Sequence, residues 1–329
     1  MRTLIFLLIS LMSLSLIPAV MAQSDAIIRV PDDYDSISEA LEAAPDGAIV
    51  EVAAGEYAEA VVIQRPVTIR ARSQGTPILS VSEDVPIITI SNTQGVVIEG
   101  LSLINGQYGI FVTRSQGVTL RQNTISGNRL AGIKVRLASA RIEDNHITDT
   151  RPPYGQGIWV TNTTDYRPSF ITGNTISNNP LSGITTNMTG MIFIENNVVS
   201  ENGQRGGIAI TEMSHAVVQG NTVSDNAGNG IYVYDLSMVA ICNNTVTNTA
   251  FSEITSGNRY GNGIAVDYHS TVDISRNNVT GNDNHGVSVL TGSLVEFGTN
   301  NVNQNGNDNV MFTDVTQGSL MPGTLALCN

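Results

Sequence analysis

Apolar and polar positions follow one phrase through most of the chain, Asn-x-Ile/Val and then Gly-Ile/Val some residues later. The Asn of this phrase occurs eight times, at Asn123, Asn145, Asn174, Asn197, Asn221, Asn244, Asn277 and Asn300. The spacings are 22, 29, 23, 24, 23, 33 and 23 residues, so five of the seven units have nearly the same length. A fixed period of this size predicts a solenoid, in which each unit stacks on the next.

Each unit holds three short alternations of apolar and polar residues, the pattern of strands with one buried face. The position two residues after the Asn is always Ile or Val: Ile125, Ile147, Ile176, Val199, Val223, Val246, Val279 and Val302. Three strands per unit describe one coil of a parallel β-helix, and parallel crossovers are right-handed almost without exception. We therefore predict an all-β fold, a single-stranded right-handed parallel β-helix of about 11–12 coils.

Two other solenoids compete for this pattern, and neither fits it. Leucine-rich repeats share the period but need several Leu per repeat, and a left-handed hexapeptide helix needs a shorter period. Asn suits the corners of a β-helix because it tolerates the left-handed backbone region and can bond the same amide one coil away. Insertions at 150–156, 162–167 and 249–262 lengthen two units, and we expect them to project as loops from one face.

The two ends of the chain depart from the repeat. An apolar run after Arg2, followed by small residues up to Ala22, has the features of a cleaved signal peptide, so we expect a secreted protein, extracellular or periplasmic. Ser36-Ile-Ser-Glu39 is a capping box ahead of an apolar helical face, which predicts a helix that covers the first coil. The expected boundaries are a signal peptide over 1–22, a strand and capping helix over 23–47, the β-helix over 48–312 and a C-terminal tail over 313–329.

Charge and cysteine content limit the choice of partners. The formal charge is −13, with 29 acidic against 16 basic residues, and Lys134 is the only lysine. Without a basic stripe, nucleic acid is a poor partner, and no later segment has the apolar length of a membrane span. Cys242 and Cys328 either pair in an oxidising compartment or remain two thiols. The oligomeric state and any bound metal stay open.

The segment YDSISEALEAAPDGAIVEVAAGEYAEAVVI, residues 34–63, resembles the opening of secreted right-handed β-helix proteins. These include the pectate-lyase-like and pectin methylesterase-like groups, NosD-type proteins and the carbohydrate-binding and sugar-hydrolase repeat family. The resemblance covers roughly residues 28–312 and implies the fold and a carbohydrate context. The catalytic motifs of pectin methylesterases and polygalacturonases are absent, and a NosD-like copper context lacks clustered His, Met or Cys ligands. The positions that carry acids in polygalacturonases hold Gln156, Ser182, Gly206, Asn229 and Asn262 here.

A candidate site follows from stacking the coils. Outward residues of consecutive coils lie about 4.8 Å apart, so aligning the Gly-Ile strands shows which side chains share a column. The columns and the two longest loops gather basic and aromatic residues on one face: Lys134, Arg136, Arg151, Tyr154, Trp159, Tyr232, Tyr234, Arg259 and Tyr260. Aromatic faces suit sugar stacking and basic groups suit carboxylates or sulfates, although aromatic columns also stabilise a sheet surface on their own.

Three acids form the candidate catalytic group at one end of this face. Glu212 and Asp235 should be neighbours in one column, with Asp267 one coil further. Carboxylates this close raise one another's pKa or hold a cation such as Ca²⁺, and no other cofactor is indicated. In an acidic protein, the same residues could equally be solvated acids at turns.

Three functions therefore remain open. The first is a polysaccharide lyase or epimerase that uses the acids on the sheet face. The second is a non-catalytic surface or matrix protein that binds glycans through the aromatic residues. The third is an adhesin-like structural solenoid that serves as a spacer. We expect binding of a polysaccharide or glycan, with its processing conditional on convergent acids.

Overall fold

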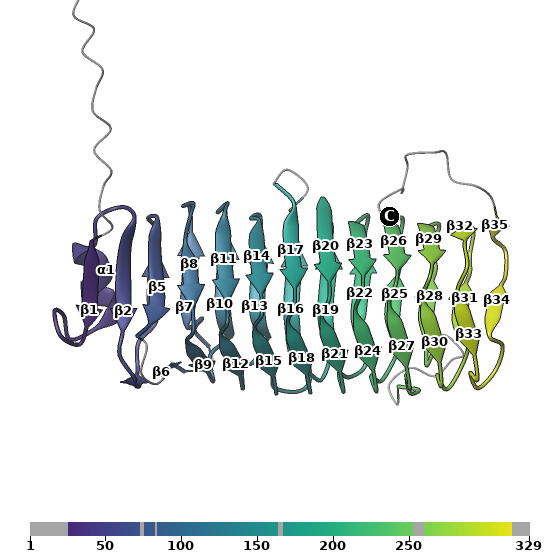
Figure 1. Ribbon diagram of the computed structural model, residues 1–329, viewed down its shortest axis with the longest axis horizontal. Coiled ribbons are helices and arrows are strands. Elements are labelled where there is room, and N and C mark those ends of the chain that lie inside the picture. Colours follow the sequence, from purple (N-terminus) through teal and green to yellow (C-terminus); the bar gives the residue numbers. More distant parts are fainter. Residues whose placement is uncertain (1–25, 73–75, 83, 164–166, 253–259, 318–329) are drawn as a thin grey trace, which may run out of the picture.

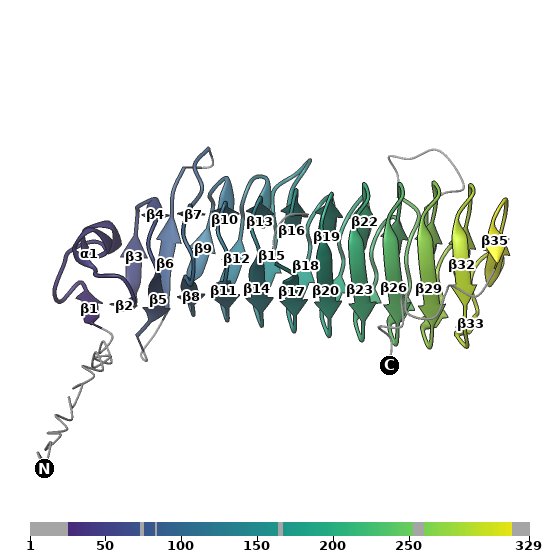
Figure 2. The same cartoon turned by 90° about the horizontal axis from the view of Figure 1, so that it is seen from above.

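The computed structural model describes residues 26–72, 76–82, 84–163, 167–252 and 260–317. Over these ranges the chain is a long parallel β-solenoid, and its strands succeed one another along the long axis (Figure 1). Every coil adds one strand to each of three sheets, here called A, B and C, and Figure 2 shows the same stack from above. The predicted all-β parallel fold is confirmed.

Sheet A begins with the first strand of the described chain. In these ranges it has 13 strands, each paired in parallel with the next. They are β1 (Ile27–Val30), β2 (Ala48–Val52), β5 (Val67–Ala71), β8 (Val97–Glu99), β11 (Val118–Arg121), β14 (Ala140–Glu143), β17 (Ser169–Thr172), β20 (Met191–Glu195), β23 (His215–Gln219), β26 (Met238–Cys242), β29 (Thr271–Ser275), β32 (Leu294–Phe297) and β35 (Thr316–Gln317).

Sheet B carries the strand that follows the repeated Asn. Its 11 strands within the described residues are mostly three residues long. They are β3 (Gly55–Tyr57), β6 (Pro77–Ser80), β9 (Ser102–Ile104), β12 (Thr124–Ser126), β15 (His146–Thr148), β18 (Thr175–Ser177), β21 (Val198–Ser200), β24 (Thr222–Ser224), β27 (Thr245–Thr247), β30 (Asn278–Thr280) and β33 (Asn301–Asn303).

Sheet C carries the Gly-Ile strands and therefore the predicted site. It too has 11 strands in the part of the chain that the structure describes. They are β4 (Val61–Ile63), β7 (Ile88–Ser91), β10 (Tyr108–Thr113), β13 (Ala131–Arg136), β16 (Gln156–Thr161), β19 (Ser182–Asn187), β22 (Ile208–Thr211), β25 (Ile231–Val233), β28 (Ile264–Val266), β31 (Val287–Val289) and β34 (Val310–Phe312).

The core is a set of Ile and Val columns that run along the inside of the three sheets. In sheet B, Val223 pairs with Val199 on one side and Val246 on the other, and all three are fully buried. The predicted column from Ile125 to Val279 is therefore confirmed. A one-residue slip of register would turn this column to the solvent, so the alternation of apolar and polar residues determines the register.

The repeated Asn residues form a buried ladder at the corner between sheets A and B. The side chain of Asn197, for example, donates to Oδ1 of Asn221 at 3.0 Å, and the same oxygen accepts from the Asn197 backbone N–H at 2.9 Å. The ladder confirms the predicted bonds between coils. The left-handed residue of the corner, however, directly precedes the ladder Asn, for example Asn196 with a φ of 55°.

A second ladder, at the corner between sheets B and C, was not predicted. It lies five residues after the first one and contains Asn128, Thr150, Asn179, Asn202, Asn226, Thr249, Asn282 and Asn305. Asn202 is typical, because its Nδ2 donates to Oδ1 of Asn226 at 3.0 Å and to the carbonyl of Ile176 at 3.1 Å. The two ladders together satisfy buried polar groups along the length of the stack.

The helix α1 (Ile37–Ala43) lies at the end of the stack that begins with β1 (Figure 1). Oγ of Ser36 accepts from the Glu39 backbone N–H at 3.1 Å, as the capping box predicts. A second acid, Glu59, accepts from the backbone N–H groups of Ile37 and Ser38 at 2.8 and 3.0 Å. The buried face of the helix thus covers the first coil, and Glu59 fastens the start of the helix to that coil.

Some expectations fall outside the described residues. These are the signal peptide over 1–22, most of the tail over 313–329, and Cys328 as the partner of Cys242. Cys242 itself is buried at the end of β26. The boundaries therefore stay predictions, whereas Cys242 is disulfide-bonded and not a free thiol. Among the described residues, no helix has the length and apolarity that a membrane span requires.

Candidate functional site

The outward side chains of sheet C stack in the columns that the alignment predicted. Lys134 pairs with Trp159, and Trp159 pairs in turn with Thr185 on the next strand. Further along the same column, Ala209 pairs with Tyr232. The expected register of the site is therefore correct, and it places the candidate aromatic residues on one face of sheet C.

A groove of about 330 Å³ lies on this face, over β19, β22 and β25. Its lining combines three tyrosines, one arginine, one carboxylate, one alanine and three small polar side chains: Thr185, Asn187, Arg205, Ala209, Thr211, Glu212, Tyr232, Tyr234 and Tyr260. Arg205 precedes β22 in the chain and Glu212 directly follows that strand, so the two opposite charges come from its two ends. The groove is thus a tyrosine-rich trough with a cation on one side and a carboxylate on the other.

Two of the lining tyrosines, Tyr232 and Tyr234, pack in a row with Tyr268, which is not part of the lining. The ring centroids of Tyr232 and Tyr234 are 5.5 Å apart, and those of Tyr234 and Tyr268 are 4.7 Å apart. Loss of hydration raises the pKa of Tyr234, and the nearby Tyr268, Asp235 and Asp267 raise it further. A side-chain hydrogen bond with Tyr268 also raises this pKa, so the Tyr234 hydroxyl remains protonated at neutral pH.

A chain of hydrogen bonds crosses the floor of the groove. Trp159 Nε1 donates to Oδ1 of Asn187 at 2.8 Å, and Nδ2 of Asn187 donates to Oγ1 of Thr211 at 2.6 Å. The same Nδ2 group lies 3.4 Å from Oε1 of Glu212. Thr211 then donates to the carbonyl of Thr186 at 3.0 Å. These bonds hold Asn187 and Thr211 in fixed orientations beside the carboxylate.

The three candidate acids follow the sheet C strands of three consecutive coils, but they do not form a metal site. Glu212 and Asp235 occupy equivalent left-handed positions in adjacent coils, as predicted, and both are partly exposed. Asp267 is buried, and its Oδ1 accepts from the backbone N–H of Tyr268 at 2.9 Å. Among the described residues, no group of three or more His, Cys, Asp or Glu could hold a metal ion. We therefore assign no Ca²⁺ site to these acids.

Lys134 does not extend the groove as expected, because it is only 4% exposed. Its Nζ lies 2.8 Å from the centroid of the Trp159 ring, over one face of the indole. Burial lowers the pKa of Lys134 to about 6, and the neighbouring positive charge of Arg136 adds to the effect. Arg136 itself is exposed at the end of β13. Of these two cations, only Arg136 is accessible to an anionic ligand.

The loop residues divide into those that reach the groove and those that do not. Arg151 donates to Oδ1 of Asn105 at 2.9 Å, two coils back along the stack. Tyr154 is 66% exposed and does not line the groove, whereas Tyr260 does. Arg259 lies outside the described residues. The expected wall from 150–156 is therefore absent from the groove lining, and the 249–262 connection contributes Tyr260.

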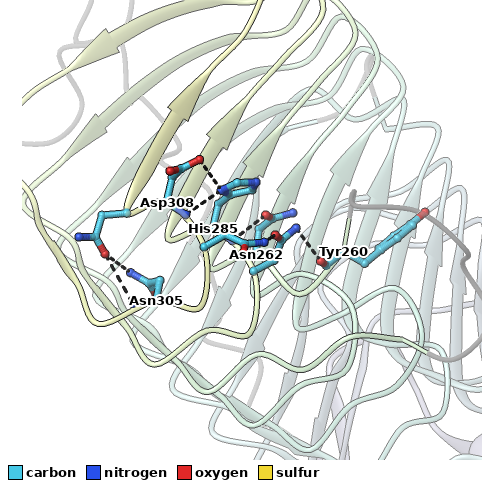
Figure 3. Close-up of polar contacts among 8 residues, drawn as sticks. Tyr260, Asn262, His285, Asn305 and Asp308 are labelled. Atoms are coloured by element: carbon cyan, nitrogen blue, oxygen red, sulfur yellow. Dashed lines mark hydrogen bonds and ion pairs between the residues drawn. The ribbon is translucent and has the colours of Figure 1, made fainter.

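Polar contacts with the following coils hold the segment that carries Tyr260 (Figure 3). Asn284 Nδ2 donates to the carbonyl of Tyr260 at 3.1 Å, and Asn262 Oδ1 accepts from the His285 backbone N–H at 3.2 Å. His285 Nδ1 in turn accepts from the Asp308 backbone N–H at 3.2 Å. The position of Tyr260 in the groove thus depends on two further coils of the stack.

Arg205 is the main residue that the sequence analysis missed. It lies in the connection 201–207, two residues before Gly207. The sequence columns included only the residue directly before each Gly-Ile strand, so Arg205 fell outside them. A larger hollow of about 620 Å³ lies elsewhere, over the first coils, and its lining includes Asp46, Gln64, Asn92 and Arg114 but no aromatic residue. The tyrosine groove is the better candidate because it joins aromatic faces with opposed charges.

Comparison with solved structures finds the same fold in proteins of low sequence identity. A periplasmic alginate epimerase has a TM-score of 0.60 at 14% identity, with 90% of this chain and 84% of that chain covered. The A-module of a mannuronan C-5 epimerase from Azotobacter vinelandii has a TM-score of 0.58 at 14% identity, covering 91% and 96%. A pectate lyase has a TM-score of 0.56 at 13% identity, covering 83% and 72%. Identities this low show the fold alone.

Comparison of sequences gives one curated relative and one family. A cell surface glycoprotein of Methanothermus fervidus is 31% identical over 133 residues, which cover 40% of this chain and 22% of that protein. The chain thus spans less than a quarter of the length of this relative. The family model described as the right-handed β-helix region matches residues 86–206 and 138–305. Because these matches cover more than half of the 329 residues, the chain belongs to the right-handed β-helix family.

Proposed function

We propose that the protein binds a polysaccharide in the groove between Arg205 and Glu212 on sheet C. The observation that carries the proposal is the groove itself, a hollow of about 330 Å³ lined by Tyr232, Tyr234 and Tyr260. Tyrosine rings present broad apolar faces at a low cost in conformational entropy, and a sugar ring can stack on such a face. The hydroxyl and amide groups around the rings add the directional contacts that fix a sugar.

The opposed charges give the groove a polarity across its width. Arg205 can bind a carboxylate or sulfate through paired N–H donors, while Glu212 can only accept hydrogen bonds once it is ionised. Strands of one sheet are about 4.8 Å apart, so a groove over three strands has room for a short run of sugars. An acidic polysaccharide whose hydroxyl groups face Glu212 fits this arrangement best.

The structural neighbours support the same class of partner. An alginate epimerase, a mannuronan epimerase and a pectate lyase share this fold, and their names refer to polymers of acidic sugars. If the protein also processes its polysaccharide, we propose a lyase or epimerase reaction with Glu212 and Asp235 as the acid–base candidates. Export by the signal peptide over 1–22 belongs to the proposal as well, because such a polymer lies outside the cytoplasm.

Binding can be tested with the secreted protein on a glycan array and by calorimetry with mannuronate and galacturonate tetrasaccharides. We expect Tyr232→Ala and Arg205→Ala each to weaken binding at least tenfold, because one removes a stacking face and the other the cation. Arg121→Ala, on the outer side of sheet A, is the matched control and should bind like the wild type. Absence of any glycan binding by the wild type would refute the proposal.

Catalysis needs a separate measurement. Lyase activity produces an unsaturated sugar that absorbs in the ultraviolet, and epimerisation exchanges the C5 proton with deuterated solvent. We expect Glu212→Gln to abolish whichever signal the wild type shows, even at a polysaccharide concentration that saturates the variant. If the wild type binds but gives neither signal, the protein is a binding module.

A non-catalytic surface protein is the second candidate function. The observation that favours it is the similarity to a cell surface glycoprotein over 133 residues. In that case the solenoid would display the groove at the cell surface, and binding without turnover would be its complete activity. Binding without either catalytic signal would distinguish this function from the enzymatic one.

A further inference from the structure

Trp159 contacts the groove only through another residue. It does not line the groove, whereas Asn187 does, and the indole Nε1 donates to Oδ1 of Asn187 at 2.8 Å. Lys134 Nζ lies 2.8 Å from the ring centroid and occupies one face of the indole. A sugar therefore cannot stack on that face, and the role that the sequence suggested for Trp159 needs revision.

The indole determines which way the amide of Asn187 points. An indole nitrogen is a donor only, while an amide offers an acceptor on one side and two donors on the other. Oδ1 must therefore turn toward Trp159, and Nδ2 must turn toward Thr211 and Glu212, as observed at 2.6 and 3.4 Å. The reversed amide would place two donors against each other and leave Glu212 facing an oxygen.

The donor-to-acceptor direction of these hydrogen bonds determines which groups the Glu212 side of the groove, here called the Glu212 wall, offers to a ligand. Asn187 donates to Thr211, and Thr211 donates onward to the carbonyl of Thr186, so both donors are already used within the protein. Among the described residues, the carboxylate of Glu212 receives only the long contact from Asn187, and a carboxylate has further acceptor positions for a ligand. This wall therefore accepts hydrogen bonds and offers few donors to a ligand.

We propose that Trp159 is a positioning residue, which orients Asn187 so that Nδ2 faces Thr211 and Glu212 and thereby holds the Glu212 carboxylate in place as an acceptor for sugar hydroxyls. The inference rests on the proposed function for its ligand, but the orientation of Asn187 is a property of the free protein. Trp159 is the single tryptophan and Lys134 the single lysine of the chain, so both can be followed without interference from other residues of their kind.

The first experiment needs no ligand. The side-chain amide signals of Asn187 are compared by NMR between the wild type and Trp159→Phe, which keeps an aromatic ring but removes the N–H donor. We expect these signals to shift or broaden because the amide is free to turn. Tyr57→Phe, which removes the hydroxyl that donates to Ala53, is the matched control and should leave them unchanged. Unchanged Asn187 signals in folded Trp159→Phe would overturn the inference.

The reverse variant guards against a folding defect in Trp159→Phe. In Asn187→Leu the indole N–H loses its acceptor, so the one indole resonance of the protein should move to the position of a free indole. An indole resonance that stays in place would show that Asn187 is not its partner. The indole resonance of Asn187→Leu can be measured even if Trp159→Phe is too unstable to study.

The second experiment measures affinity for the mannuronate tetrasaccharide. We expect Trp159→Phe and Asn187→Leu each to weaken binding about tenfold, and the double variant to be no weaker than either one. Wild-type affinity in Trp159→Phe, or additive losses in the double variant, would assign Trp159 to direct stacking and overturn the inference. A wild type that does not bind this sugar counts against the proposed function, while the two NMR comparisons still decide the role of Trp159.

Discussion

At the scale of the residue, Lys134 is the most unusual group of the described chain. It occupies an outward position of sheet C, yet its neighbours bury it almost completely, and its pKa falls to about 6. The indole of Trp159 opposes this effect, because an ammonium group is attracted to the face of the ring. The balance of the two effects determines whether the amine carries a proton at neutral pH.

Replacing Lys134 by Met should make the stability less dependent on pH. Between about 6 and 10.5 the unfolded chain binds a proton that the folded chain does not, so the wild type gains stability as the pH rises through this window. We expect Lys134→Met to be more stable than the wild type near pH 6, by at most about 6 kcal/mol. The difference should shrink toward pH 10. Urea unfolding across this range is the measurement, and a difference that does not change with pH would contradict the prediction.

At the scale of the element, the Asn ladders explain how polar side chains can occupy buried corners between the sheets, because the ladder bonds satisfy their hydrogen-bonding groups. In the first ladder, each inner rung accepts from the backbone and side chain of the previous rung and donates to the next, as Asn221 does between Asn197 and Asn244. The rungs before Asn300 and Asn305 are almost completely buried, so an unpaired inner rung would leave polar groups without water. The ladders thus couple neighbouring coils in addition to the backbone bonds of the sheets.

Removal of an inner rung should therefore cost more stability than removal of an end rung. Asn221→Ala leaves the backbone N–H and the amide of Asn197 without their acceptor, and we expect a loss of about 2–4 kcal/mol. Asn300→Ala, at the end of the ladder, also removes the acceptor of one Asn, Asn277, but it lies at a part-buried position and should cost less. Equal losses in thermal or urea unfolding would show that the ladder bonds do not couple the coils.

At the scale of the whole molecule, we expect the capped end to keep the solenoid from pairing with another copy. α1 and β1 lie over the first coil, and the contacts of Glu59 fasten the helix there. Deletion of residues 23–47 would expose the strand edge of β2, and we expect the shortened protein to self-associate. Light scattering during size-exclusion chromatography measures this, with the full-length protein as the reference. A monomeric, folded deletion variant would place the barrier to association elsewhere.

The sequence predicted the scaffold better than the contents of the site. The position of Val223 follows from the alternation, because only one register buries every Ile and Val of the column. The column of Trp159 and Tyr232 was correct for the same reason. The predicted left-handed conformation of the ladder Asn was wrong. Asn is favoured both in a ladder and in a left-handed turn, and only the backbone dihedral angles show which residue takes which role.

Side-chain direction is what the repeat could not indicate. Lys134 faces outward, yet Trp159 covers it, and Arg151 bends back to Asn105 two coils away. Arg205 enters the groove from the connection 201–207, where its backbone N–H donates to the carbonyl of Leu181 in the previous coil, and it lies outside the strands that were aligned. The strands repeat more regularly than the connections, so the register could be predicted, whereas the burial of side chains and the membership of the groove required the structure.

The second ladder also has a consequence for the chemical lifetime of the protein. Asn202 is followed by Gly203, the pair in which backbone nitrogen attack most easily turns an amide into a carboxylate. In the folded chain its Nδ2 is held by Asn226 and Ile176, which keeps that reaction slow. Once the protein is unfolded, deamidation can proceed, and the resulting carboxylate would meet Oδ1 of Asn226 instead of donating to it. Prolonged heating should therefore leave a growing fraction of chains that cannot return to the same fold.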